Sequence, residues 1–197
     1  MSPEQIQKNK EEFINIYKEN IKRQGSEQLL EWIEKTDFFT APASTRYHNA
    51  CEGGLCAHSI SVYHTFMDKH YVDEEDDLES VTISTLLHDL CKAEFYTIST
   101  RNVKNKETGQ WEQVPYFSIE DKFPYGHGEK SVFLIERKMR LKLDEAMAIR
   151  WHMGEFESGG KAIGDAYNKY PLAVKVHLSD LESTYLREKG TSEVHRR

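Results

Sequence analysis

The sequence predicts a mainly α-helical fold that carries one inserted β-hairpin, at about residues 95–119. Apolar residues recur at helical spacing along most of the chain, and only two neighbouring segments are rich in β-branched and aromatic residues. The length suits one domain, because 197 residues with 9 Phe, 3 Trp and 10 Tyr can bury a single core. We expect N-terminal helices over 1–45 packed on a core domain over 46–190, and a frayed tail over 191–197.

The N-terminal region is expected to form two helices. The first is predicted over 3–22, where apolar residues recur at steps of seven and four: Ile6, Phe13, Tyr17 and Ile21. Lys and Glu fill the other faces of this helix. Gly25 breaks the pattern, and Ser26 is a suitable N-cap for a second helix that continues to Ile33.

The core region is expected to be helical on both sides of the hairpin. Helices are predicted at about 54–70 and 79–92, and the second has almost no polar face, as expected for a buried helix. Turn residues at Asn105–Gly109 separate two strand-like segments, Phe95–Thr100 and Trp111–Ile119. Further helices are predicted at about 129–140, at 144–153 beginning near Asp144, and at 171–188 beginning at Pro171.

The composition argues against several classes of partner. Lys and Arg total 26 against 33 Asp and Glu, a net charge of −7, so general binding to duplex DNA is not expected. No segment approaches the roughly 18 apolar residues of a membrane span, and the charged N-terminus does not resemble a signal segment. We therefore expect a cytoplasmic protein with no membrane partner. The cysteines, Cys51, Cys56 and Cys91, form no Cys-x-x-Cys pair and are expected to be reduced and mostly buried.

The adjacent pair His88-Asp89 is the most informative local feature. It lies in the apolar segment predicted to be a buried helix, and an unpaired buried carboxylate costs several kcal/mol. A divalent cation would remove this cost, because neutral imidazole and ionised carboxylate are ordinary ligands of transition metals. Lys92 follows on the same predicted helix face, where it could place positive charge beside a metal-bound phosphate. The alternative is a buried His–Asp–Lys cluster that holds no metal.

Four histidines with small or apolar neighbours and one later aspartate follow a distinctive order along the predicted helices. They stand in the segments Gly53–Ser59, Leu86–Lys92, Gly126-His127, Trp151–Gly154 and His177–Leu181. This order of His, His-Asp, His, His and Asp resembles the HD-domain metal-dependent phosphohydrolase superfamily, over about residues 45–188. Within that superfamily it is similar to the branch that contains HD-domain 3′–5′ exoribonucleases and many unassigned phosphohydrolases.

The resemblance implies an HD-domain helical bundle over 46–190 with one or two divalent transition metal ions. The implied ligands are His58, His88, Asp89 and Asp180 for one ion, and His127 and His152 for a second ion that shares Asp89. Iron, manganese, zinc, cobalt and nickel all suit such ligands. A metal-activated water would attack a nucleotide or related phosphoester, with Asp89 and Lys92 as the catalytic residues.

Two other functions remain open. One is a 3′–5′ exonuclease for short single-stranded nucleic acid, which could stack bases on Trp111, Tyr116 and Phe117. The simpler expectation is that these aromatic residues form the buried face of the hairpin. The other function is a catalytically silent nucleotide-binding sensor. Candidate substrate contacts, chosen for loop position and charge, are Arg46, His48, Lys104, Lys122 and Lys130. The oligomeric state is not predicted.

The chain departs from the family pattern at two positions. Cys91 stands where the family often has glycine, and a packing variation is expected because cysteine is small. Met153 stands where the exoribonuclease branch often has a second histidine, so that ligand is absent here. His177 precedes Asp180 by three residues and is a rival ligand, although a position behind the ligands or in solvent is the simpler expectation.

Overall fold

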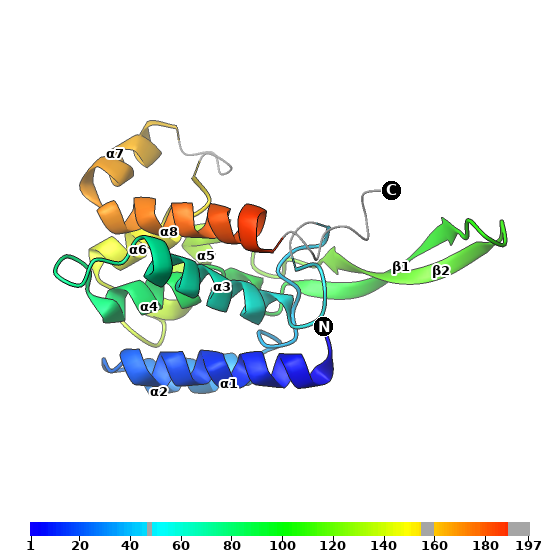
Figure 1. Cartoon of the computed structure of the whole chain (residues 1–197), viewed down its shortest axis with the longest axis horizontal. Helices are drawn as coiled ribbons and strands as arrows, with labels where there is room; N and C mark the ends of the chain where they lie inside the picture. The colour runs from blue at the N-terminus through cyan, green and yellow to red at the C-terminus, as the bar shows by residue number, and fades with distance from the viewer. Residues whose placement is uncertain (47–48, 155–159, 189–197) are drawn as a thin grey trace.

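The computed structural model describes residues 1–46, 49–154 and 160–188, which form a helical body and a projecting hairpin (Figure 1). The elements are α1 (Pro3–Asn20), α2 (Ser26–Glu34), α3 (Gly54–Lys69), α4 (Leu78–Leu86), β1 (Tyr96–Lys104), β2 (Trp111–Ile119), α5 (His127–Glu136), α6 (Leu143–Arg150), α7 (Lys161–Lys169) and α8 (Pro171–Glu182). A 3₁₀ turn (Leu90–Lys92) follows α4, and a π-helical turn (Ser183–Arg187) follows α8. The predicted mainly helical architecture with one inserted hairpin is confirmed.

The helical body has α1 and α2 on one side, α3 and α4 in the middle and α8 on the opposite side (Figure 1). α1 contacts α3 and α4, and α8 contacts α3 and α6. The larger core cluster unites α1, α2 and α3 through buried residues that include Phe13, Leu29 and Leu55. A smaller cluster joins α3, α4, α6 and α8 through Phe66, Val81, Ala148 and Val176. Within the described part of the chain, none of the helices combines the length and the apolar character that a bilayer crossing requires.

The predicted buried helix over 79–92 is wrong in its C-terminal half. α4 ends at Leu86, and Leu87 leaves helical geometry with φ −112° and ψ 4°. His88 and Asp89 therefore lie in a turn, and Lys92 belongs to the 3₁₀ turn that follows rather than to a shared α-helical face. Apolar periodicity could not locate this helix end, because the Ser and Thr side chains of α4 are buried as well.

Several other helix predictions need correction. The predicted helices over 129–140 and 144–153 end too late, because α5 ends at Glu136 and α6 ends at Arg150. α7 was not predicted, and the N-cap of α2 is Gly25, whereas Ser26 is the first helical residue. Gly25 has φ 93°, and a Cβ at this position would clash with the carbonyl oxygen of Lys138. Glycine is therefore required between α1 and α2. The predicted tail over 191–197 lies outside the described residues.

A buried ion-pair network ties the connection between α1 and α2 to α4 and α6. The Arg23 guanidinium donates to both carboxylate oxygens of Glu145 at 2.7 Å and to Glu79 at 3.1 Å. Glu145 is 0% exposed, and its carboxylate also accepts a hydrogen bond from the Ser80 hydroxyl at 2.6 Å. The positive charge of Arg23 compensates the burial of the Glu145 carboxylate.

Replacement of Glu79 by glutamine is expected to reduce the loss of stability in acid. Burial raises the pKa of the Glu79 carboxyl, but hydrogen bonds from the backbone N–H of Lys22 and from the guanidinium and backbone N–H of Arg23 outweigh burial and hold the pKa below its ordinary value of 4.5. Because the folded-state pKa is the lower one, the carboxylate stabilises the fold at neutral pH. This contribution is lost as the pH falls from about 4.5 through the folded-state pKa. Melting temperatures measured from about pH 7 to about pH 3 should fall less steeply for Glu79→Gln than for wild type; parallel curves would contradict the assignment.

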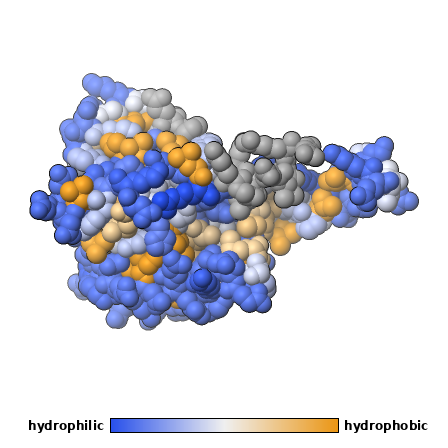
Figure 2. Space-filling view, viewed as in Figure 1, coloured by the Kyte–Doolittle hydropathy of each residue, from blue (hydrophilic) through white to orange (hydrophobic). Residues whose placement is uncertain are grey.

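The hairpin projects away from the helical body as an exposed arm (Figure 1). β1 and β2 pair in antiparallel register as far as Lys104 opposite Trp111, and no residue of either strand is buried. The expectation that Trp111, Tyr116 and Phe117 form a buried face is therefore wrong, and Trp111 is 70% exposed. Strand alternation alone cannot reveal whether another element covers a hairpin. Figure 2 shows apolar residues at the surface of this arm.

Shortening the arm is expected to leave the helical body stable. Ile98 lies opposite Phe117, so an Asn-Gly turn placed between these two residues can replace residues 99–116. Because the removed residues are not buried, we expect a change below about 1 kcal/mol, or a shift in melting temperature below about 4 °C. Circular dichroism melting of the shortened chain measures this. A much larger fall would mean that the arm stabilises the body.

Candidate metal centre

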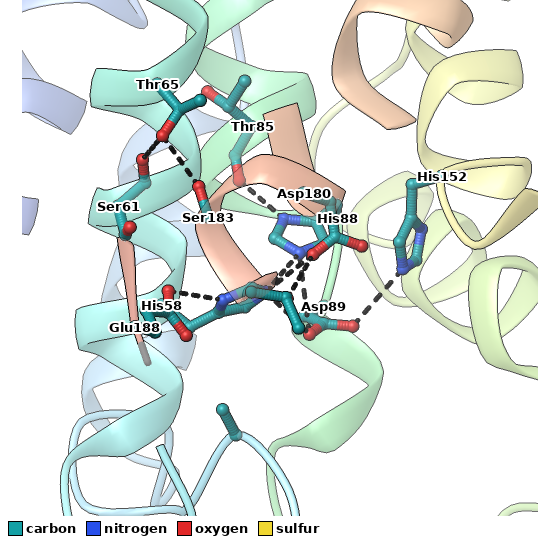
Figure 3. Close-up of polar contacts among 12 residues, drawn as sticks. His58, Ser61, Thr65, Thr85, His88, Asp89, His152, Asp180, Ser183 and Glu188 are labelled. Atoms are coloured by element: carbon teal, nitrogen blue, oxygen red, sulfur yellow. Dashed lines mark hydrogen bonds and ion pairs between the residues drawn. The ribbon is translucent and has the colours of Figure 1, made fainter. Parts of the chain in front are cut away.

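All six side chains predicted to be metal ligands converge inside the helical body, and Figure 3 shows five of them. They are His58 of α3, His88 and Asp89 in the turn after α4, His127 in the first turn of α5, His152 in the turn after α6, and Asp180 of α8. Five of the six residues are buried. The exception is His127, whose side chain is 24% exposed, so the cluster reaches the surface beside the start of α5.

The first group of ligands surrounds the Nε2 atom of His58. This atom lies 3.3 Å from His88 Nε2 and 3.2 Å from Asp180 Oδ1. Asp89 Oδ2 lies 3.5 Å from His88 Nε2 and 3.8 Å from His58 Nε2. Neighbouring ligands of a tetrahedral ion with bonds of about 2.0–2.2 Å are roughly 3.3–3.6 Å apart, so these atoms already have the spacing of a ligand set.

The second nitrogen of each buried histidine fixes the direction in which the ring presents its lone pair. Nδ1 of His88 lies 2.7 Å from the carbonyl oxygen of Thr85, and Nδ1 of His152 lies 2.7 Å from that of Ile149. A carbonyl only accepts, so each Nδ1 carries the hydrogen and each Nε2 directs a lone pair into the cluster. Metal-ligating histidines typically have this arrangement.

His58 is oriented by a carboxylate in the same way. Its Nδ1 lies 3.0 Å from Glu188 Oε1, which leaves Nε2 facing His88 and Asp180. Burial lowers the pKa of His58, but Glu188 and Asp180 outweigh burial and raise it to about 10. Burial lowers the pKa of His88 to about 3. Two nitrogen lone pairs 3.3 Å apart require a positive charge between them, which is a proton on His58 or a metal ion in its place.

The second group lies on the other side of the Asp89 carboxylate. Asp89 Oδ1 is 2.8 Å from His127 Nε2 and 3.5 Å from His152 Nε2. His152 is 0% exposed, and its Nε2 makes no hydrogen bond within the described residues. The two oxygens of Asp89 thus face different ligand groups, which is the position a bridging carboxylate occupies. The donor atoms of both groups therefore fit divalent transition metals.

Lys92 contacts the shared carboxylate directly. Its Nζ donates to Asp89 Oδ2 at 2.6 Å, and its side chain is 12% exposed. Burial raises the pKa of the Asp89 carboxyl, but Lys92 and His88 outweigh burial and hold it well below its usual range. Burial lowers the pKa of Lys92, and Asp89 reverses this effect and raises it. Asp89 is therefore ionised and Lys92 charged, although the two residues share no α-helix.

The candidate substrate contacts are dispersed. Arg46, Lys104 and Lys122 are exposed, and Lys104 lies in the last residue pair at the far end of the hairpin. Lys130 is buried, and its ammonium group donates to Asp121 at 2.8 Å and lies over the ring of Phe95. His48 lies outside the described residues.

Sequence reasoning did not identify two residues that contact the predicted ligands, Glu188 and Cys91. It placed a third such residue, His177, correctly. Glu188 orients His58 from a position 130 residues away, so no local pattern indicates it. Cys91 is buried, and its Sγ lies 3.4 Å from Nδ1 of His127; its place two residues after Asp89 was the available signal. His177 hydrogen-bonds the carbonyl oxygen of His152 through Nδ1 and so supports a ligand from behind.

Comparisons with family models, with curated proteins and with solved structures returned no match to this chain.

Proposed function

We propose that this chain is a metal-dependent phosphohydrolase of the HD type that acts on a nucleotide or related phosphoester. The observation that carries the proposal is the pair of Nε2 atoms of His58 and His88, 3.3 Å apart, with each Nδ1 engaged by an acceptor. Asp180, Asp89, His127 and His152 extend this pair into two adjoining ligand groups. The ordered HD-type pattern in the sequence supports the same assignment.

Several residues of this chain would have different roles in the reaction. When bound, divalent ions in these positions supply Lewis acidity and lower the pKa of water, as phosphoester hydrolysis requires. Asp89 would hold both positions at a fixed separation because its two oxygens face different groups. Lys92 orients that carboxylate, and since an ammonium has three N–H donors it can also donate to a phosphoryl oxygen. The partial exposure of His127 supports an entrance for substrate beside α5.

Metal analysis followed by a substrate screen tests this proposal. Protein purified without chelator is analysed for transition metals, stripped, and reconstituted with iron, manganese, zinc, cobalt or nickel. Nucleoside mono-, di- and triphosphates and a generic phosphodiester are then offered to each form. We expect at least one ion per chain and hydrolysis that disappears on stripping and returns on reconstitution. Failure to retain any metal after reconstitution would overturn the proposal. Tight nucleotide binding without turnover by every metal form would identify a silent sensor instead.

A second candidate, a single-strand exonuclease, is favoured by one observation on the arm. Trp111 is 70% exposed and lies opposite the exposed Lys104, which places a stacking surface beside a positive charge. Fluorescence titration with a short oligonucleotide tests it. Binding by wild type that is lost in Trp111→Ala, but kept in the nearby Val103→Ala, would support nuclease activity. No binding by any of the three proteins would limit the substrate to small phosphoesters, and equal binding by all three would show that Trp111 does not stack on the oligonucleotide.

Replacement of Lys92 by alanine is expected to lower turnover while metal content is retained. Loss of one preorganised electrostatic contact lowers kcat by roughly 10- to 1000-fold. The measurement is turnover and metal content of Lys92→Ala beside Lys8→Ala, an exposed control on α1. If Lys92 served only a structural cluster, its loss would leave Asp89 unpaired and lower the melting temperature with unchanged turnover per folded molecule.

A further inference from the structure

Cys91 lies at the second ligand group rather than in the apolar core. Its Sγ is 3.8 Å from Nε2 of His127, the nitrogen that also lies 2.8 Å from Asp89 Oδ1. Donor atoms of Asp89, Cys91 and His127 lie within 4.8 Å of one another. Since a Zn–S bond is about 2.3 Å and a Zn–N bond about 2.0–2.1 Å, adjacent sulfur and nitrogen ligands of a tetrahedral ion are roughly 3.6 Å apart. The observed separation of 3.8 Å is close to that value.

The backbone holds the thiol in this position. The N–H of Cys91 donates to the hydroxyl of Ser131 at 3.0 Å, and Ser131 is fully buried in α5. His127 stands four residues earlier in the same helix, so one rigid element positions both the imidazole and the anchor of the cysteine. The thiol and the imidazole are therefore expected to remain together whether or not an ion is bound.

A second, independent observation concerns the Nε2 atom of His152, which lacks a hydrogen-bond partner among the described residues. His152 Nε2 is buried and without a hydrogen bond within the described residues, and it lies 3.5 Å from Asp89 Oδ1. Its Nδ1 is engaged by the carbonyl oxygen of Ile149, so ring rotation cannot satisfy Nε2 without losing that bond. The rings of His152 and His127 are 5.1 Å apart between centroids. Asp89 Oδ1 thus lies near the His152 nitrogen that makes no hydrogen bond and near His127, whose ring lies beside the Cys91 thiol.

We propose that the Cys91 thiolate is a ligand of the second metal ion, with Asp89, His127 and His152 as the other protein donors. The inference rests on the proposed function, because it names a further ligand at that same centre. On binding, the S–H bond is replaced by a metal–sulfur bond and the proton passes to solvent. The two metal positions then differ in chemistry: the first has only nitrogen and oxygen donors, whereas the second has sulfur and selects softer ions such as zinc over manganese.

Cobalt loading distinguishes sulfur ligation from metal binding in general. Stripped protein is titrated with Co²⁺ and its absorption recorded, because a cobalt–thiolate bond produces a charge-transfer band in the near ultraviolet that nitrogen and oxygen donors lack. We expect this band in wild type and in Cys51→Ser, a control at another free cysteine. Cys91→Ser should lose the band and still bind cobalt through the first ligand group, as shown by the visible bands and by metal content.

The possible outcomes distinguish ligation by the Cys91 sulfur from the existence of the metal centre itself. Visible cobalt bands without the ultraviolet band in wild type would overturn sulfur ligation and leave the metal centre intact. A band that persists in Cys91→Ser would also overturn it, because another thiol would be the ligand. Absence of any bound cobalt in wild type would contradict the metal centre itself. Since a Cys91 variant could fail to fold, X-ray absorption of zinc-loaded wild type gives a second readout: a zinc–sulfur shell at about 2.3 Å is expected, and a shell of only nitrogen and oxygen would refute the inference.

Discussion

Replacement of Asp89 by alanine is expected to abolish hydrolysis and to release most of the bound metal. Among the six predicted ligands, this carboxylate has one oxygen toward each group, with Oδ2 toward His88 and Oδ1 toward His127. Its loss therefore removes a donor from each position and leaves the Lys92 ammonium without its carboxylate partner. Metal-dependent stabilisation should disappear at the same time, because binding energy contributes to the stability of the folded state.

The measurements for Asp89→Ala are metal content, turnover and the difference in melting temperature between stripped and reconstituted protein. Asp89→Asn keeps the volume and provides the variant that folds if alanine does not. Asp165→Ala, at an exposed position of α7, is the control and should match wild type in all three. Normal turnover in both Asp89 variants would end the phosphohydrolase proposal.

The second large effect concerns stability rather than catalysis. Arg23→Ala should lower the free energy of unfolding by about 3 kcal/mol, the lower end of the range for breaking a buried ion pair. The lower end applies because the Arg23 side chain is 16% exposed, although Glu145 is 0% exposed. Removal of the guanidinium leaves the Glu145 carboxylate with Ser80 and the backbone N–H of Lys142 as hydrogen-bond donors. The melting temperature should fall by roughly 6–12 °C for a chain of this size.

Chemical denaturation of Arg23→Ala beside Lys69→Ala checks this prediction. Lys69 pairs with Glu182 at 2.9 Å, but its side chain is 41% exposed, so its loss should change stability by less than about 1 kcal/mol. The double variant Arg23→Met, Glu145→Leu removes both charges and should recover part of the loss. Equal effects of Arg23→Ala and Lys69→Ala would show that the network stabilises no more than a surface pair.

Helix positions could be predicted from the sequence wherever one face is apolar and the other polar. α1 and α2 agree with prediction within about two residues, since charged residues mark their outer faces. Apolar periodicity did not predict the end of α4 at Leu86, because a wholly buried segment has the same run of apolar residues in a helix and in a turn. It also missed the short helix α7. The arm was located correctly, but its exposure depends on which elements lie beside it, and no local pattern records that.

The candidate site was largely predictable because its residues carry a chemical signature. His58, His127 and His152 were selected for their small or apolar neighbours, and the structure brings all three to Asp89. The groups that orient the histidine rings could not be identified from their sequence neighbours. Two of them are backbone carbonyl groups, which every residue possesses, and the third is Glu188, one of many surface-type residues near the end of the chain.

The contact between His58 and Glu188 has a consequence for biosynthesis. The two residues are 130 positions apart, and a ribosome makes the chain from the N-terminus. While α3 emerges, His58 has neither Glu188 to orient its ring nor Asp180 beside its Nε2. The first ligand group is therefore incomplete in every nascent chain until Asp180 and Glu188 have been synthesised. An ion would therefore bind after α8 has been made, and it would not organise the earlier helices as they emerge.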